Sequence, residues 1–233
     1  MIGPMDGRRL DEVPRLYGEL AGWFHLLTAP EDYAGEAADI LARLRAAVDG
    51  PLETLLELGS GGGNTASHLR ASLRLTLTDR SVAMLEMSRT INPGCEHLVG
   101  DMRTLRLDRT FDAVLIHDAV MAMTTEADLE AALRTAAVHL RPGGAAILVP
   151  DHVRETFAPT TGHGGHDAGG RGLRYLEWTT DPDPADDTYL VDFAILTRER
   201  DGSVSVHSDR HVLGLFSRST WLRLLEAAGL PRR

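Results

Sequence analysis

The stretch from Leu52 to Val149 alternates short apolar runs with helical segments, and this alternation constrains the fold most strongly. Five runs are short and rich in Leu, Ile and Val, as strands are: 52–58, 73–78, 96–99, 113–117 and 145–149. Helical segments are expected between most of them, at 64–69, 81–89 and 125–140. This order predicts βαβ units and an α/β fold with a covered parallel sheet. A turn at 141–144, Arg-Pro-Gly-Gly, should end the long helix before the fifth strand.

The flanking segments predict three further parts of the chain. Before the sheet we expect a helical lid of two helices, one over Leu10–Leu27 and one from Glu31 to Gly50-Pro51. After the sheet, Thr161–Gly172 is dense in Gly and His and should form a loop. An antiparallel insertion and a last helix should follow, with strands at 174–179, 188–199 and 203–216, a hairpin turn at 201–202 and the helix at 217–228.

Length and charge narrow the class of protein. A chain of 233 residues is expected to form one domain, divided into a lid (1–50), a core (51–151), a loop and insertion (152–216) and a C-terminal helix (217–233). The net charge of −10 disfavours nucleic acid and anionic membranes as partners. No apolar run is long enough to span a membrane, no export signal opens the chain, and Cys95 has no disulfide partner, so we expect a soluble cytoplasmic protein.

A glycine-rich turn, Glu57–Asn64 with the sequence ELGSGGGN, joins the first predicted strand to the next helix. Glycines let the backbone turn tightly and let a ligand approach main-chain N–H groups. Asp79 ends the second strand, where a doubly wound sheet places a carboxylate that accepts hydrogen bonds from ribose hydroxyls. Asp101 ends the third strand, where a carboxylate can accept from an adenine amino group.

Two cofactors fit such a turn, a dinucleotide or S-adenosylmethionine (SAM). The dinucleotide fingerprint requires glycine at position 64, where this chain has Asn64. The spacing is instead acidic-x-Gly-x-Gly-x-Gly. Together with Asp101-Met102, Phe111–Val114 and Arg141–Gly144, in that order, it resembles the class I SAM-dependent methyltransferases over roughly residues 52–150.

This resemblance implies a Rossmann-like sheet and a set of cofactor contacts at its carboxyl edge. It implies contacts with SAM from Gly59, Ser60 and Gly61 under the methionine and ribose, Asp79 at the ribose diol, Arg80 and Met84 beside the adenine, Asp101 and Met102 at the adenine edge, and the backbone of His117 at the methionine amino group. In the family a final β-hairpin completes the sheet, and it is missing after Gly229-Leu230. The sheet edge is then covered by the insertion strands or by a partner subunit, or the chain is a truncated form.

A narrower resemblance links the flanks to bacterial aminosugar N,N-dimethyltransferases of desosamine-type pathways. It is carried by Tyr17 with Trp23-Phe24, by residues 32–37 (DYAGEA) and by residues 208–216 (SDRHVLGLF). It implies that the N-terminal helices close over the cofactor and that Tyr17 contacts SAM, whereas Trp23 is expected to pack in the core. The segment from Ala158 to Ala185, where the acceptor should bind, matches poorly.

Methyl transfer requires an acceptor with a free lone pair, because a protonated amine cannot attack and a hydroxyl can need a general base. Histidine suits that role near neutral pH, and His152 and His211 are the candidates for base or acceptor anchor. Tyr33, Tyr175 and Trp178 are candidate acceptor contacts, although the last two could equally pack the insertion onto the main sheet. His163 and His166 lack a scaffold that would fix metal geometry, so no metal site is expected.

The sequence therefore predicts a SAM-dependent methyltransferase that acts on an amine or hydroxyl of a small molecule, such as an aminosugar or another secondary metabolite, and releases S-adenosylhomocysteine. A second copy of the chain is a candidate partner. Two alternatives stay open: a SAM-binding protein without transfer activity, and a methyltransferase with a carboxylate or carbon acceptor.

Overall fold

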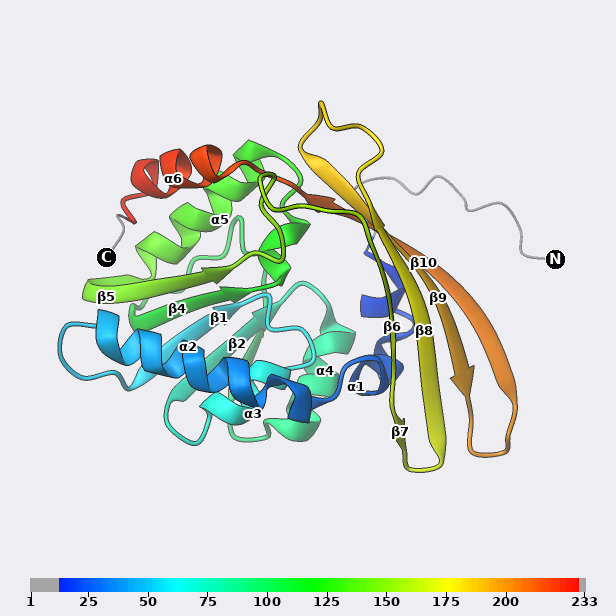
Figure 1. Cartoon of the computed structure of the whole chain (residues 1–233). Coiled ribbons are helices and arrows are strands. Elements are labelled where there is room, and N and C mark those ends of the chain that lie inside the picture. Colours follow the sequence, from blue (N-terminus) through cyan, green and yellow to red (C-terminus); the bar gives the residue numbers. More distant parts are fainter. Residues whose placement is uncertain (1–12, 231–233) are drawn as a thin grey trace.

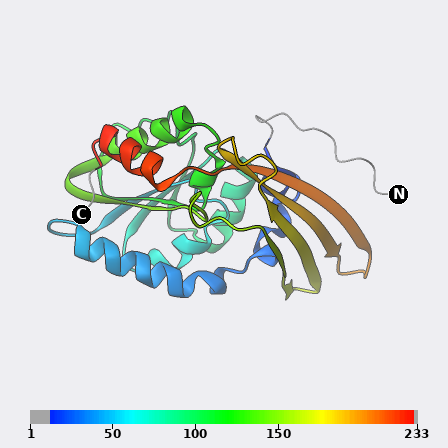
Figure 2. The ribbon, with the colours of Figure 1, turned by 45° about the horizontal axis from the view of Figure 1, so that its top comes forward.

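The computed structural model describes residues 13–230, so the start of the first predicted helix and the last three residues lie outside the described part. A parallel sheet with helices on both faces lies beside a long antiparallel sheet that curves away from it (Figure 1). The second view shows the two sheets meeting at one side of the molecule (Figure 2).

The parallel sheet has the strand order β3-β2-β1-β4-β5, and all of its pairings are parallel. Its strands are β1 (Thr54–Leu58), β2 (Arg74–Asp79), β3 (Glu96–Val99), β4 (Phe111–His117) and β5 (Leu140–Val149). This order confirms the predicted Rossmann-like α/β fold. Because every strand runs the same way, the carboxyl ends of β1, β2, β4 and β5 meet at one edge.

Helices cover the sheet on both faces because the strands are nearly continuous apolar runs whose successive side chains point to opposite faces. Leu55 packs with Ile40 and Leu44 on one face, while Leu56 and Leu58 belong to the cluster on the other face. The helices are α2 (Ala34–Ala47), α3 (Asn64–Leu69), α4 (Val82–Ile91), the 3-10 turn η4 (Ala119–Ala122), α5 (Glu126–Val138) and α6 (Arg218–Ala227). The last helix is confirmed, and the Ser217 hydroxyl caps it by accepting from the Thr220 N–H.

The first predicted helix is wrong as a continuous element. The chain forms three short helices instead: η1 (Arg15–Tyr17), η2 (Ala21–Trp23) and α1 (Phe24–Leu27). Gly18 ends η1 with φ −122° and ψ −103°, a conformation outside the helical region. The second predicted helix is confirmed, since the 3-10 turn η3 (Pro30–Tyr33) leads directly into α2.

The antiparallel insertion is confirmed, but it starts earlier than predicted. Its strands are β6 (Thr160–Gly164), β7 (Asp167–Ala168), β8 (Arg171–Thr180), β9 (Thr188–Arg198) and β10 (Val204–Gly214), in the order β10-β9-β8-β6. The predicted loop at 161–172 is therefore wrong. The small side chains there give no hydrophobic pattern that would predict a strand. The strands are held by backbone pairing with β8, as at Thr160 opposite Thr179.

The edge strand β5 differs from prediction in two ways. Residues 141–144 lie inside β5 as an irregularity, with a register shift opposite Phe111–Ala113 and Gly143 at φ +79°. In addition, the insertion strands form their own sheet and do not cover β5, and within residues 13–230 only β4 pairs with it. The expectation that the insertion strands cover this edge of the parallel sheet is thus wrong. No helix in this part of the chain is long and apolar enough to cross a membrane.

Candidate functional site

The glycine turn lies between β1 and α3 at the carboxyl edge of the sheet. Gly59 adopts φ +76° and Gly61 φ +52°, which L-residues with a Cβ rarely adopt. A Cβ at Gly59 would also lie 2.5 Å from the Cβ of Ala119 and 2.8 Å from the Cε of Met102. The turn therefore needs glycine for its backbone shape and for the close approach of the chain that follows β4.

Asp79 is fixed beneath this turn, as its place at the end of β2 predicts. Its Oδ2 accepts the Gly61 N–H at 2.9 Å and its Oδ1 accepts the Ser81 N–H at 2.8 Å. Burial raises the pKa of Asp79, and the two backbone N–H groups partly oppose that change. Met84, predicted beside the same turn, is buried next to Gly61.

Asp101 lies two residues after the end of β3, within the same region. Both of its oxygens accept from the Arg103 guanidinium, with Nη2 to Oδ2 at 2.7 Å, and Arg80 lies 3.6 Å away. These cations hold the pKa of Asp101 below its usual range. The structure thus brings the predicted cofactor residues after β1, β2 and β3 together, and Met102 packs among them in the core.

Two buried polar atoms in the turn region point to a polar ligand. Ser60 Oγ and Glu57 Oε2 have no hydrogen-bond partner within residues 13–230. Glu57 is only 2 % exposed, and burial together with the nearby Asp118 and Asp79 raises its pKa to about 8. Unsatisfied buried groups are rare in folded proteins, so the glycine cradle and this free hydroxyl fit the polar methionine and ribose parts of SAM.

The N-terminal segment packs against the turn. His25 Nε2 lies 3.0 Å from the Gly62 carbonyl oxygen, and Ser81 Oγ donates to the Tyr17 carbonyl oxygen at 2.5 Å. Burial raises the pKa of the Tyr17 hydroxyl, with additional contributions from the carboxylates of Asp151, Asp118 and Asp79. Tyr17 therefore lies in the electrostatic field of the carboxylates that follow β2, β4 and β5.

A cleft of about 430 Å³ opens where this N-terminal segment meets the ends of β4 and β5. Four carboxylates are among its lining groups, and the residues that line it are Thr28, Asp32, Tyr33, Glu36, Asp118, Val149, Pro150 and Asp151. Tyr33, a predicted acceptor contact, lies in this cleft and packs edge-on against His117, with ring centroids 6.0 Å apart. The cleft is the structure's candidate acceptor site.

Asp118 and Asp151 form a carboxyl pair in the cleft that sequence reasoning missed. Their side chains hydrogen-bond each other, and burial raises the pKa of both. The charge of Glu36 raises the pKa of Asp118 further, and the charge of Asp118 raises that of Asp151. The pair therefore keeps one proton at a pH where an isolated Asp has lost it. The available signal was positional: each Asp lies within two residues of the end of a strand, and β4 and β5 are neighbours.

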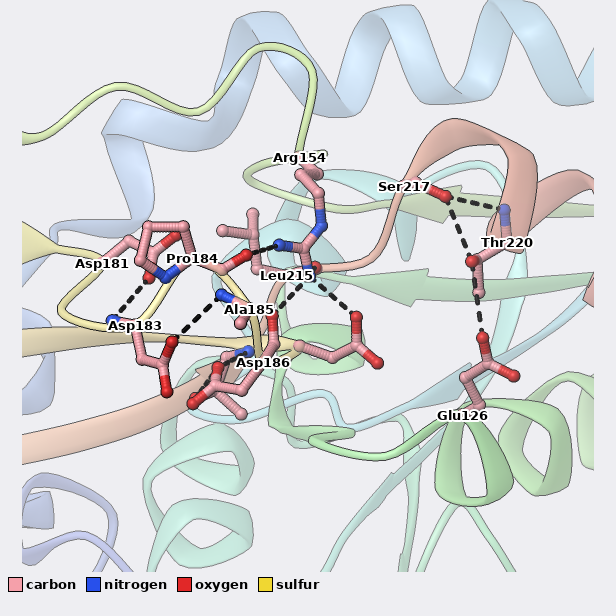
Figure 3. A network of polar contacts seen from close by, with 12 residues as sticks. Glu126, Arg154, Asp181, Asp183, Pro184, Ala185, Asp186, Leu215, Ser217 and Thr220 are labelled. Atoms are coloured by element: carbon pink, nitrogen blue, oxygen red, sulfur yellow. Dashed lines mark hydrogen bonds and ion pairs between the residues drawn. The ribbon is translucent and has the colours of Figure 1, made fainter.

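Arg154 orders the chain that leaves this carboxyl pair. Its guanidinium donates to the carbonyl oxygens of Pro184 at 2.8 Å, Asp186 at 2.5 Å and Leu215 at 3.1 Å (Figure 3). These bonds tie the segment after β5 to the turn between β8 and β9 and to the end of β10. One side of the cleft is thereby braced by the insertion.

The two predicted catalytic histidines have different surroundings. His152 packs edge-on against Phe157 and Tyr189, with ring centroids 5.3 Å away in each case. His211 is 4 % exposed, and its Nε2 lies 3.2 Å from Asp209 Oδ2. Its ring lies 5.2 Å from that of Tyr17, so it is placed behind Tyr17 in the interior.

Tyr175 and Trp178, the two candidate acceptor contacts on the insertion, lie on opposite faces of β8. Tyr175 faces inward and packs edge-on against Phe193 at 5.8 Å between centroids. Trp178 lies three residues further along β8, on the opposite face, and is 63 % exposed. The two-residue period of a strand separates them.

Two further features lie outside this constellation. Residues 13–230 contain no group of three or more His, Cys, Asp or Glu side chains arranged for a metal ion. His166, considered for such a site, lies 3.1 Å from Asp32 Oδ2 instead.

A larger groove of about 560 Å³ runs along the opposite ends of the strands beside Arg70, Arg74 and Arg109, and none of the predicted site residues lines it.

Comparison with known proteins identifies the class. Residues 55–144 match the family model described as a methyltransferase domain. The strand order and the glycine turn agree with this match, so the chain carries a SAM-dependent methyltransferase domain over these residues, and SAM is its cofactor.

More specific similarities extend over most of the chain. It is 29% identical over 218 residues to dTDP-3-amino-3,6-dideoxy-alpha-D-glucopyranose N,N-dimethyltransferase of Streptomyces fradiae, across 91% of this chain and 84% of the relative. The crystal structure of DesVI from Streptomyces venezuelae matches with a TM-score of 0.81 and 26% identity, over 91% and 89% of the two chains. The SAM-bound structure of CalS10, an amino pentose methyltransferase from Micromonospora echinaspora, matches with a TM-score of 0.73 and 29% identity, over 84% and 83%.

Proposed function

We propose that this methyltransferase transfers the SAM methyl group to the amino group of a small sugar-type acceptor, of the kind named for its relatives. The observation that carries the proposal is the acidic cleft beside the glycine turn. Asp32, Glu36, Asp118 and Asp151 line it together. Clustered carboxylates attract a cationic amine and repel an anionic acceptor, so they favour an amine over a carboxylate substrate.

The cofactor contacts in this proposal follow the carboxyl edge of the sheet. SAM supplies a methyl group on a sulfonium sulfur, which leaves as a neutral thioether. We assign its contacts to Gly59, Ser60 and Gly61 in the turn, Asp79, Arg80 and Met84 after β2, Asp101 and Met102 after β3, and the end of β4 at His117. The fit rests on the glycine cradle and on the free Ser60 hydroxyl.

The acceptor contacts lie between the N-terminal segment and the insertion. Tyr33 lines the cleft, and Tyr175 faces inward from β8. His152 follows the carboxyl pair directly and is assigned to the acceptor side. His211 is assigned a positioning role behind Tyr17, because it is buried and already bonded to Asp209.

The first experiment separates cofactor binding from the rest of the proposal. Calorimetry with SAM and S-adenosylhomocysteine should give micromolar dissociation constants. Asp79→Ala should weaken both by at least about tenfold, because it removes the acceptor of the Gly61 N–H and leaves that turn unsupported. Wild-type protein that binds neither compound would contradict the cofactor assignment.

The second experiment tests the acceptor class. The protein is incubated with SAM and one of three dTDP-sugars that differ only in carrying an amine, a hydroxyl or a carboxylate at the acceptor position. Mass spectrometry should show added methyl groups on the amine alone. Transfer only to the hydroxyl or carboxylate compound would overturn the amine assignment, and SAM binding without transfer to any of a wider acceptor panel would favour a SAM-binding protein.

We further propose that the chain forms a homodimer through the outer face of the insertion sheet. Five large apolar side chains are exposed on this face: Leu176, Trp178, Leu196, Val204 and Val206. They come from three neighbouring strands, and Val206 is directly opposite Leu196. Arg174 and Arg198 lie on the same face between these side chains. Exposed apolar side chains gathered on one face can mark an interface, and a two-fold axis would let the face cover itself.

A further inference from the structure

We propose that the Asp118–Asp151 carboxyl pair is the proton acceptor that converts the bound ammonium of the substrate to the reactive amine. The inference rests on the proposed function, because only an amine acceptor needs this step. At neutral pH a simple aliphatic amine is mostly protonated and has no lone pair for attack. A site that binds the cation must therefore also remove its proton.

The fold brings the two carboxyls together at the floor of the cleft. Asp118 directly follows β4, and Asp151 is separated from the end of β5 at Val149 by Pro150. The Asp118 N–H donates to the Val149 carbonyl oxygen at 3.0 Å, which continues the strand pairing and fixes the register of the pair. Both side chains line the cleft and hydrogen-bond each other.

A buried histidine lies against two of the carboxylates that line the cleft. His117 is 7 % exposed, and its Nε2 lies 2.9 Å from Glu36 Oε1 and 3.4 Å from Asp118 Oδ1. Within residues 13–230, however, this nitrogen makes no well-aligned hydrogen bond. A buried ring nitrogen directed at a group of carboxylates, without an aligned partner, marks the cleft as a place for a polar ligand.

The pair also lies next to the cofactor region. Ala119, directly after Asp118, approaches Gly59 so closely that a Cβ there would be 2.5 Å away. The charges of Asp79, Asp118 and Asp151 all raise the pKa of Tyr17. Those of Asp118 and Asp79 also raise the pKa of Glu57 in the turn. An amine held at the pair is therefore close to the turn that we assign to SAM.

The charges around the pair favour its role as the acceptor of a single proton. The groups that face it are mostly anionic or aromatic: Asp32 on η3, Glu36 on α2, His117 on β4, His152 after β5, Glu177 on β8, and the hydroxyls of Tyr17, Tyr33 and Tyr189. Burial raises the pKa of both carboxyls, Glu36 adds to the rise at Asp118, and Asp118 adds to the rise at Asp151, which brings their affinity for a proton closer to that of an amine.

The step balances as a proton transfer followed by a displacement. The ammonium gives one proton to the carboxylate of the pair, which forms a carboxylic acid and frees the nitrogen lone pair. The nitrogen then attacks the methyl carbon, an N–C bond forms, and the C–S bond breaks with its electrons left on sulfur. The product is a methylated ammonium, so a second methylation needs the same base after its proton has passed to water in the open cleft.

The test is a set of single-turnover rates against pH at saturating SAM and dTDP-3-amino-3,6-dideoxyglucose. Asp151→Asn and Asp118→Asn should each lower the rate at pH 7 by about 10²-fold or more. The loss should shrink as the pH rises past the pKa of the bound amine, because the substrate then loses its proton without help. The dissociation constant of SAM should stay within about twofold of wild type. Asp39→Asn, an exposed carboxylate on α2 paired with Arg43, is the matched control and should behave as wild type.

The outcomes distinguish the two proposals. Wild-type protein that transfers no methyl group to the aminosugar would overturn the proposed function and this inference with it. If the wild type is active and the two Asn variants react at the wild-type rate, the inference alone is overturned. The same holds if the variants lose rate by the same factor at every pH. The wild-type profile gives a test without variants: its rate should stay flat just below the pKa of the amine, and a tenfold fall per pH unit there would contradict the proposal.

Discussion

His25 Nε2 lies 3.0 Å from the carbonyl oxygen of Gly62, so the N-terminal segment rests directly on the glycine turn. The neighbouring Phe24 ring occupies the space that a side chain at Gly62 would need, since a Cβ there would be 2.5 Å from its Cδ1. The packing of this segment and the shape of the turn therefore depend on each other. A substitution in the N-terminal segment that disturbs this packing should therefore change the affinity for SAM.

Replacing His25 with Ala should weaken SAM binding by about fivefold, which corresponds to the loss of one hydrogen bond worth about 1 kcal/mol. Calorimetry measures the change directly. His207→Ala is the matched control, because it removes a similar bond, to Thr197 Oγ1 at 3.1 Å, in the insertion sheet. Equal SAM affinities for wild type and His25→Ala would show that the turn is independent of the N-terminal segment.

Gly59→Ala should lower the free energy of unfolding by at least about 2 kcal/mol. The new Cβ would meet Ala119 and Met102, and the residue would remain at a positive φ that costs about 1–3 kcal/mol by itself. Gly94→Ala is the comparison, since no heavy atom lies within 4 Å of its added Cβ. Urea denaturation followed by circular dichroism checks both variants, and equal midpoints for the two would contradict the proposed crowding.

The parallel core and the cofactor turn could be predicted from the sequence because their signals are local. Buried strands are continuous apolar runs, and the turn at Glu57–Asn64 carries its glycines within eight positions. The strands at 160–168 gave no such signal, because their Gly and His side chains form no apolar run. Backbone pairing with β8 holds these strands in place. The broken first helix needed the angles at Gly18, which its apolar spacing does not contain.

The carboxyl pair shows the same limit within the site. Asp118 and Asp151 are 33 positions apart in the sequence, and only the pairing of β4 with β5 makes them neighbours. Sequence reasoning chose His117 and His152, which stand next to them in the chain. It had the correct strand ends, but it named His117 for its backbone and His152 for the usual chemistry of histidine, whereas burial alters the chemistry of the two acids by raising their pKa values.

Glu57→Gln should change how stability depends on pH. In the folded chain Glu57 keeps its proton up to about pH 8, whereas the ordinary value is 4.5, so unfolding between these values releases a proton. The wild type therefore loses stability as the pH rises through this window. Glutamine resembles the protonated acid but does not titrate. As the pH rises through this window, the free energy of unfolding of the variant should therefore increase relative to that of wild type by up to about 1.4 kcal/mol per pH unit. Denaturation series from pH 5 to 8 measure this difference, and parallel curves would mean that Glu57 is ionised in the fold.

Val206→Glu should convert a dimer of this chain into a monomer. Val206 is 66 % exposed on the outer face of the insertion sheet, and a carboxylate there would be desolvated if a second copy covered that face. Val138→Glu is the control, because Val138 is 53 % exposed at the end of α5, away from this sheet. Sedimentation velocity should then give one dimeric species for wild type and for the control, and a monomer for Val206→Glu. A wild-type protein that sediments as a monomer at micromolar concentration would contradict the homodimer, and the apolar face would then need a different partner.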